Sequence, residues 1–187
     1  MKRISNVGDY PVPLFYPIST RYYRSGQITA ETQVLQAAVN EIKAFPLGFY
    51  EAAIIDRLAI NITVVAGAGG VARLGIYADN GSLYPGTLLV DAGELTMETL
   101  GVRELTLSTP ISLAPGEHVW LAILPGVAAA TVTAVDYASL PALFGCDSAA
   151  ARGEFGWWKG QAYGALPITF PWGAHTTKSS FVCARIS

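Results

Sequence analysis

The residue types that could carry out catalysis are few and lie far apart in this sequence. The two histidines are His118, at the start of an alternating apolar run, and His175, in a stretch rich in aromatic residues. There is no HExxH, Gly-x-Ser-x-Gly, P-loop or dinucleotide-binding glycine pattern, and no cysteines at metal-ligand spacing. Because catalysis needs a base, a nucleophile or a metal with partners in reach, we expect no enzyme activity, no metal and no cofactor.

Carboxylates offer two weaker alternatives. Residues 79–81, Asp-Asn-Gly, together with Asp91 could supply oxygen ligands to calcium, but EF-hand spacing is absent and Asn-Gly is a common hairpin dipeptide. Two glutamates could act as the acid and base of a glycosidase. Nothing in the sequence selects a pair from the four candidates, which are Glu94, Glu98, Glu104 and Glu117.

Aromatic side chains are the only concentrated set of possible binding residues. Residues 139–175 lose the alternation seen elsewhere and predict a long, aromatic-rich loop, a type of segment that is often functional. Its rings could stack on a glycan or anchor a protein interface. Alternatively, the loop folds over one end of the domain and buries its own rings. The candidates for partner or glycan binding are Trp157, Trp158, Tyr163 and Trp172.

The first 26 residues predict an extended docking arm. Prolines at positions 11, 13 and 17 favour extended backbone. The segment is too apolar to remain free in solution, so it needs a surface to lie on. That surface is either the chain's own domain or another subunit of an assembly. The candidate docking residues are Tyr10, Leu14, Phe15, Tyr16, Ile18, Tyr22 and Tyr23.

The stretch from Asp56 to Asp91 predicts the framework that must position these side chains. Apolar residues alternate over 58–64 and again over 72–76, which is the period of strands with one buried face. The Gly-rich residues 67–70 between them predict a β-hairpin loop rather than a phosphate loop, because they open no helix. Further strand patterns cover 102–108, 118–124, 131–135 and 178–186, and Pro110 is expected to end the first of these.

This spacing of strands and Gly/Pro turns predicts an all-β fold, an antiparallel β-sandwich of jelly-roll type over residues 27–187. Residues 30–45 fit either a helix or a strand, because Leu35, Val39 and Ile42 have helical spacing while 39–45 also alternate. The run Pro46-Leu47-Gly48 is expected to end either element.

Composition narrows the classes of partner. The chain has 187 residues, of which 14% are charged, below the roughly 25% of typical domains, so much of its surface could face neighbours. A net charge of −2 without a basic stripe argues against nucleic acid. The apolar runs are too short for membrane insertion, and the N-terminus lacks the apolar core of a secretory signal. Cys146 and Cys183 predict reduced, partly buried thiols, and the sequence leaves their pairing open.

Several phrases, in order, resemble β-sandwich modules of tailed-bacteriophage virion proteins, especially tail-fibre and receptor-binding chains. They are DRLAINIT at 56–63, ARLGIYADNG at 72–81, YPG at 84–86 with DAG at 91–93, and LAPG at 113–116 followed by VWLA at 119–122. The resemblance covers about residues 28–135 and favours a strand for 30–45. Strand and turn residues carry it, so it implies a scaffold and no catalytic residue.

The resemblance implies a non-enzymatic virion structural protein, a tail-fibre or host-attachment type sandwich that docks to the particle through its N-terminal arm. We expect a homo-oligomer, with a trimer favoured by analogy, assembled in the host cytoplasm with other virion proteins. A host surface glycan is a further candidate partner. The alternatives are a capsid decoration (cement) protein and, from another class, a carbohydrate-binding module.

Overall fold

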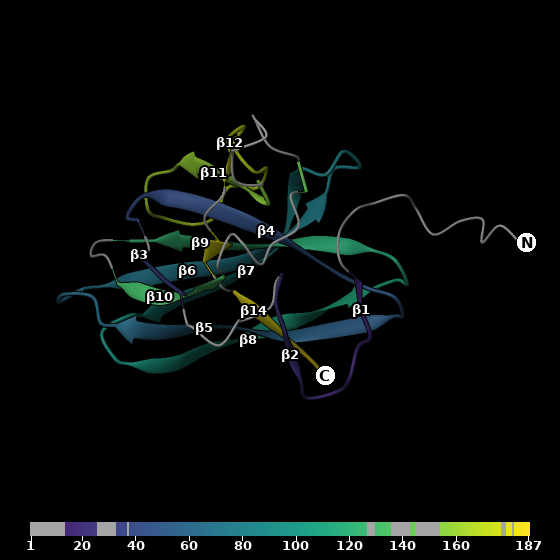
Figure 1. The fold of residues 1–187 in the computed structure, drawn as a ribbon, viewed down its shortest axis with the longest axis horizontal. Coiled ribbons are helices and arrows are strands. Elements are labelled where there is room, and N and C mark those ends of the chain that lie inside the picture. The colour runs from purple at the N-terminus through teal and green to yellow at the C-terminus, as the bar shows by residue number, and fades with distance from the viewer. Residues whose placement is uncertain are drawn as a thin grey trace, which may run out of the picture.

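The computed structural model describes residues 14–25, 33–36, 38–126, 130–135, 143–144, 154–176, 179–180 and 182–187. Their regular elements are strands, arranged as two sheets packed face to face (Figure 1). The predicted all-β sandwich is therefore confirmed. In the ambiguous region 30–45, residues 33–36 and 41–45 form strands, and residues 39–40 form a turn between them.

The first sheet contains seven strands. Six follow one another in the order β12 (Ala174–Thr176), β11 (Gly156–Gly160), β4 (Glu41–Phe49), β9 (His118–Pro125), β6 (Val71–Asp79) and β7 (Pro85–Thr96). These neighbours are antiparallel. The short β1 (Leu14–Phe15) adds to β4 in parallel.

The second sheet also contains seven strands, and all of its pairs are antiparallel. Its main order is β13 (Ser179–Ser180), β10 (Thr131–Val135), β5 (Ala53–Val64), β14 (Cys183–Ile186) and β2 (Tyr22–Tyr23). Two further strands complete it: β3 (Gln33–Gln36) pairs with β10, and β8 (Gly101–Leu113) pairs with β5.

The main hydrophobic core lies between the sheets. Leu58, Ile60 and Ile62 of β5 face Leu74 and Ile76 of β6 across it, and all five are fully or almost fully buried. Burying an aliphatic side chain of this size stabilises the fold by roughly 1.5–3 kcal/mol. The two alternating rows of the central stretch therefore do supply one core, as the sequence pattern predicts.

The predicted hairpin between those two rows is wrong. β5 pairs with β8, β10 and β14 in the second sheet, whereas β6 lies between β9 and β7 in the first (Figure 1). Residues 65–70 therefore cross from one sheet to the other. They are held against the connection between β7 and β8, because the Met97 N–H donates to the Gly70 carbonyl at 2.8 Å and the Ala66 N–H donates to the Met97 carbonyl at 3.0 Å. Alternation shows that two strands share a core, but not that they share a sheet.

Two prolines predicted to end strands lie inside them. Between residues 44 and 48, β4 has a paired strand on one side only, because β11 pairs with 41–44 and β1 with 48–49. The missing N–H of Pro46 can face the other side at no cost to the ladder. Pro110 lies in the irregularity of β8 between the pairs Arg57↔Thr106 and Ile55↔Ile111, where a bulge already interrupts the hydrogen bonding.

A second buried cluster covers the outer face of the first sheet. Trp120 and Leu124 of β9 point to this side, while Leu121 points into the main core, so β9 is buried on both faces. The cover comes from the C-terminal part of the chain, including Phe155 and Phe170. This second cluster brings the aromatic-rich segment onto the sandwich.

The covering segment is tied by its backbone to the far edge of the first sheet. The Leu88 N–H donates to the Ile168 carbonyl at 2.8 Å, and the Phe170 N–H donates to the Gly86 carbonyl at 3.0 Å. One isolated bridge, Thr87↔Thr169, lies between these two bonds. The chain thus leaves β11, crosses the outer face to β7, and returns to β12 beside β11.

Candidate binding site

The aromatic-rich region holds two strands within the stretch that the sequence predicts to be a loop. β11 pairs with β4 on one side and with β12 on the other. The loop prediction for 139–175 is therefore wrong for residues 156–160 and 174–175. Two adjacent tryptophans between glycines hide the alternation, because one ring points inward, the other points outward, and both are apolar.

The register of β11 and β12 separates the two tryptophans. Trp157 lies opposite His175, and the next pair, Trp158 opposite Ala174, faces the other way. Trp157 packs against the second cluster, and its indole Nε1 donates to the Leu83 carbonyl at 2.8 Å. Trp158 is left 36% exposed on the outer side.

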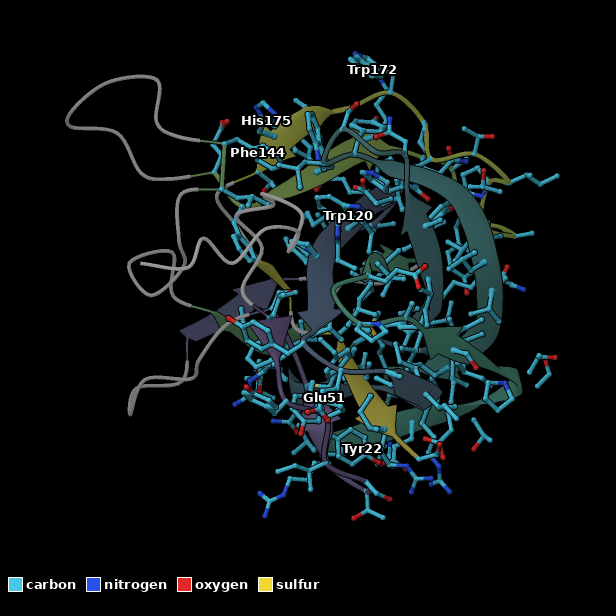
Figure 2. All side chains as sticks on the ribbon, turned by 90° about the vertical axis from the view of Figure 1, so that its right-hand side faces the viewer. Tyr22, Glu51, Trp120, Phe144, Trp172 and His175 are labelled. Carbon is cyan, nitrogen blue, oxygen red and sulfur yellow. The ribbon has the colours of Figure 1, made fainter. Side chains whose placement is uncertain are left out.

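His175 is held inside an aromatic group. Its ring is stacked on Phe144 with a centroid separation of 4.5 Å, and the Trp157 ring centroid is 4.0 Å away. The two side chains labelled Phe144 and His175 lie close together in Figure 2. Nδ1 of His175 is 2.8 Å from a carboxylate oxygen of Glu154. This arrangement fixes β12 against the sandwich.

Tyr163 is part of the cover rather than of an open surface. Its hydroxyl donates to Glu94 at 2.5 Å, and its backbone N–H donates to Oδ1 of Asn40 at 3.0 Å. Partial burial, together with the Glu94 carboxylate, raises the pKa of the Tyr163 hydroxyl. Its ring lies against Gly126, where an added Cβ would come within 3.0 Å of the ring.

Trp172 is the most exposed indole of the described region, at 76%. Its ring is stacked on the buried Tyr84, with a centroid separation of 4.8 Å and an interplanar angle of 22°. The Tyr84 hydroxyl donates to the Pro171 carbonyl and accepts from the Gly173 N–H, both at 2.9 Å. The residues on both sides of Trp172 are therefore anchored, and Figure 2 shows its indole pointing away from the body of the protein.

A depression of about 540 Å³ lies between the two exposed indoles. Within its lining, Gly173 approaches the backbone of Trp158 so closely that an added Cβ would be 2.2 Å from the Trp158 carbonyl oxygen. The lining residues are Trp158, Lys159, Gly160, Trp172, Gly173 and Ala174.

The four predicted binding residues thus divide into two pairs. Trp157 and Tyr163 are partly buried in the second cluster, as in the alternative of a segment that buries its own rings. Trp158 and Trp172 are exposed and flank one depression. Sequence reasoning missed Tyr84, which supports Trp172 from the β6–β7 turn, because no pattern in the sequence connects positions so far apart.

The N-terminal docking candidates divide in a similar way. Leu14, Phe15 and Tyr23 are partly exposed, and the latter two pack against the main core, with the ring of Tyr23 5.1 Å from that of Phe49. An added Cβ on Gly48 would be 2.7 Å from Leu14. The alternative that this segment packs on its own sandwich therefore holds for these three residues. Tyr10 lies outside the described residues.

The remaining docking candidates, Tyr16, Ile18 and Tyr22, are exposed. Tyr16, at 65% exposure, is stacked at 5.2 Å on Tyr50, which is itself 50% exposed. The backbone around them is fixed by Tyr23, whose hydroxyl donates to the Tyr16 carbonyl and accepts from the Ile18 N–H, both at 2.8 Å.

Tyr22 belongs to a polar group on the outer face of the second sheet. Its hydroxyl donates to Glu104, which also pairs with Arg57 at 3.1 Å. The hydrogen bond from Tyr22, and then that from Arg57, hold the pKa of the Glu104 carboxyl below its usual value. Nearby, Cys183 forms no disulfide with any described residue, and burial raises the pKa of its thiol. Cys146 lies outside the described part of the chain.

The carboxylates considered for calcium or glycoside chemistry have structural partners. Asp79 accepts from the Trp120 indole at 2.8 Å and lies 3.2 Å from Nε2 of His118. Burial opposes its ionisation, but the hydrogen bonds from His118 and Trp120 outweigh this and lower its pKa. Asp91 pairs with Arg73 at 2.9 Å.

The glutamates are likewise engaged separately. Glu94 and Glu104 accept from tyrosine hydroxyls, Glu98 accepts from the Gly69 N–H, and Glu117 accepts from the Ala114 N–H at 2.8 Å. Over the ranges that the structure describes, no three His, Cys, Asp or Glu side chains gather in a way that could hold a metal ion. In the same ranges there is no helix of the length and apolarity needed to cross a bilayer.

No protein-family model matches the chain, and no curated protein gives a significant sequence match. A function must therefore be argued from the residues and their geometry.

Proposed function

We propose that this chain is a non-enzymatic structural protein of a tailed-phage particle, of the tail-fibre or host-attachment type. Its N-terminal region joins it to other virion proteins, and the exposed indoles of Trp158 and Trp172 contact a partner or glycan on the host surface. The chain assembles as a homo-oligomer, for which a trimer is the leading arrangement. The placement on a phage particle rests on the strand and turn phrases of residues 28–135.

The observation that carries the attachment role is the pair of exposed indoles around one depression. Large aromatic side chains are usually removed from water, and an exposed indole that is held in place is a common anchor for a ligand. Trp172 is held by the buried Tyr84 and by hydrogen bonds on both of its sides. Such a ring loses little conformational entropy on binding, which favours affinity.

A separate observation supports docking through the N-terminal region. Tyr16, Ile18 and Tyr50 leave an apolar surface in water, and Tyr16 and Tyr50 are stacked on each other. Tyr22 and Trp172 lie at opposite ends of the molecule in Figure 2. Attachment to the particle at one end would leave the indoles at the other end free to reach a host.

Each alternative function would use only one of these two surfaces, the N-terminal tyrosine surface or the exposed indoles. A capsid decoration protein would use the tyrosine surface to lie across neighbouring capsid subunits. A carbohydrate-binding module outside any particle would use Trp158 and Trp172 alone. Both remain testable in the same experiment.

The experiment is to locate the chain on intact particles by antibody labelling and electron microscopy. Label at the tail tip or on fibres is the expected result. Label spread over the head would replace attachment by decoration. If particles carry no label while the free protein binds the antibody, the virion proposal is overturned and the carbohydrate-binding module takes its place.

A further inference from the structure

The depression between Trp158 and Trp172 has the size and lining of a site for one or two sugar rings. Its volume of about 540 Å³ lies within the range of roughly 300–1,000 Å³ that is typical of small-ligand sites. The two glycines and the alanine of its lining add little bulk, so a ligand can reach the backbone between the indoles.

The exposed face of Trp172 suits a flat, amphipathic ligand. One face of its indole is covered by Tyr84, and the side chain remains 76% exposed. A pyranose ring offers a face of C–H groups to an aromatic ring and directs its hydroxyls outward, towards the backbone and water. A lipid chain or an apolar helix would instead need a continuous apolar groove, whereas this lining contains backbone at three small residues and one cation.

That cation is Lys159, the single ionisable side chain among the six lining residues. Its side chain starts beside Gly173, where an added Cβ would be 3.4 Å from the Lys159 Cβ. Among the described residues no carboxylate lies within ion-pair distance of Lys159. A flexible lysine stem can bring its ammonium group to an anionic group on a ligand held between the indoles.

We propose that this depression binds an acidic glycan, with a pyranose ring stacked on Trp172 and a sugar carboxylate paired with the Lys159 ammonium. The inference rests on the attachment role proposed above and specifies the class of its ligand. Trp158 is a further lining residue of the same depression. Tyr84 acts as a positioning residue, because it contacts Trp172 rather than the sugar.

The test is calorimetric titration of the full chain with oligogalacturonate, oligosialate and hyaluronan oligomers. Each is compared with its carboxyl-methylated form, which has the same rings without the charge. We expect binding of at least one acidic oligosaccharide, weakened about tenfold or more by methylation or by 0.5 M salt. The proposal is overturned if no acidic oligosaccharide binds, or if the methylated form binds equally well.

Single-residue variants test which side chains contact the glycan. Trp172→Ala should weaken binding about tenfold or more, and Trp172→Phe should retain part of the affinity. Lys159→Ala should remove the difference between the acidic and methylated forms. The matched controls are Ile168→Ala, which removes a side chain 78% exposed on the same segment, and Arg21→Ala, which removes an exposed cation elsewhere. Equal effects of Ile168→Ala and Trp172→Ala would contradict the assignment.

Binding of the labelled chain to host cells separates this inference from the attachment role. If Trp172→Ala abolishes cell binding while the acidic oligosaccharides do not bind, the attachment role stands and the acidic glycan is excluded. If the wild-type chain binds no host cell, the attachment role itself fails, whatever the titrations show.

Discussion

The segments 14–25 and 154–176 are built alike but present different surfaces. Each adds two short strands to the sandwich, turns some aromatic rings inward and leaves others in water. Trp172, in the second segment, rests on Tyr84, which is 6% exposed and hydrogen-bonded to the backbone on both sides of the indole. Tyr16, in the first, rests on Tyr50, which is itself half exposed.

The difference lies in the support beneath the exposed ring. A buried support holds the exposed ring in one place beside a depression, which suits a small ligand. An exposed support makes a broad apolar surface instead, which suits contact with another protein. The following predictions are ordered from the largest expected effect to the smallest.

The largest expected difference in stability is between variants of the two supporting tyrosines, Tyr84 and Tyr50. Tyr84→Ala should lower the free energy of unfolding by about 3 kcal/mol, because it empties part of the second cluster and removes two hydrogen bonds. Tyr50→Ala should change it by less than about 0.5 kcal/mol, as an exposed substitution does. Urea unfolding followed by circular dichroism measures both. Similar losses for the two variants would remove the distinction between the supports.

Substitutions at inward and outward residues of segment 14–25 should also differ in their effects, the first lowering stability and the second lowering association. The double variant Phe15→Ala, Tyr23→Ala should lose about 2–3 kcal/mol, because two half-buried rings leave the main core. The variant Tyr16→Ala, Ile18→Ala should unfold at nearly the wild-type temperature but lose its association with other virion proteins. Differential scanning calorimetry and sedimentation give the two readouts. A stable first variant would mean that this segment adds nothing to the core.

Crowding at Gly173 provides a sharper test of the second segment. Gly173→Ala should cost about 1–3 kcal/mol, because its Cβ would be 2.2 Å from a backbone oxygen that cannot move alone. Gly164→Ala is the control, since nothing lies within 4 Å of a Cβ there. Chemical denaturation compares the two. An unaffected Gly173→Ala variant would show that the backbone at Trp158 is free to shift.

The smallest expected effect is on how the free energy of unfolding depends on pH in the acid range. Asp79 and Glu104 both have lowered pKa values in the folded protein, so each contributes stability above its unfolded pKa of about 4 that is lost as the pH falls through its folded pKa. The side chain of Asp79 is 9% exposed and that of Glu104 is 33% exposed, so solvent screens Glu104 more.

Asp79→Asn should therefore flatten the fall in stability between pH 5 and acid more than Glu104→Gln does. Unfolding free energies measured at several pH values provide the comparison. A larger change for Glu104→Gln would show that burial of Asp79 is less important than its partners.

The sequence predicted the two-layer β architecture because its apolar residues alternate. It could not predict the sheet to which each strand belongs: residues 58–64 and 72–76 face the same core from different sheets. It singled out the aromatic residues of this region, two of which the structure leaves exposed around one depression. It could not separate Trp157 from Trp158, because their division depends on the register of β11 against β4 and β12.

The sequence also could not predict that Tyr84 supports Trp172. Tyr84 comes from the turn between β6 and β7, and it meets Trp172 only when the chain crosses the outer face of the first sheet. No local pattern reports such a long-range contact. The same holds for Lys159, the one ionisable side chain among the described residues that line the depression.

The position of β14 sets an order of events during synthesis. Residues 183–186 form an inner strand of the second sheet, between β5 and the N-terminal β2, and bring Ala184 and Ile186 into the main core. A ribosome that has made β2 and β5 has therefore not yet supplied the strand that joins them. At about 5–20 residues per second, the growing chain spends seconds with this gap open. Chaperone demand should therefore peak just before β14 emerges.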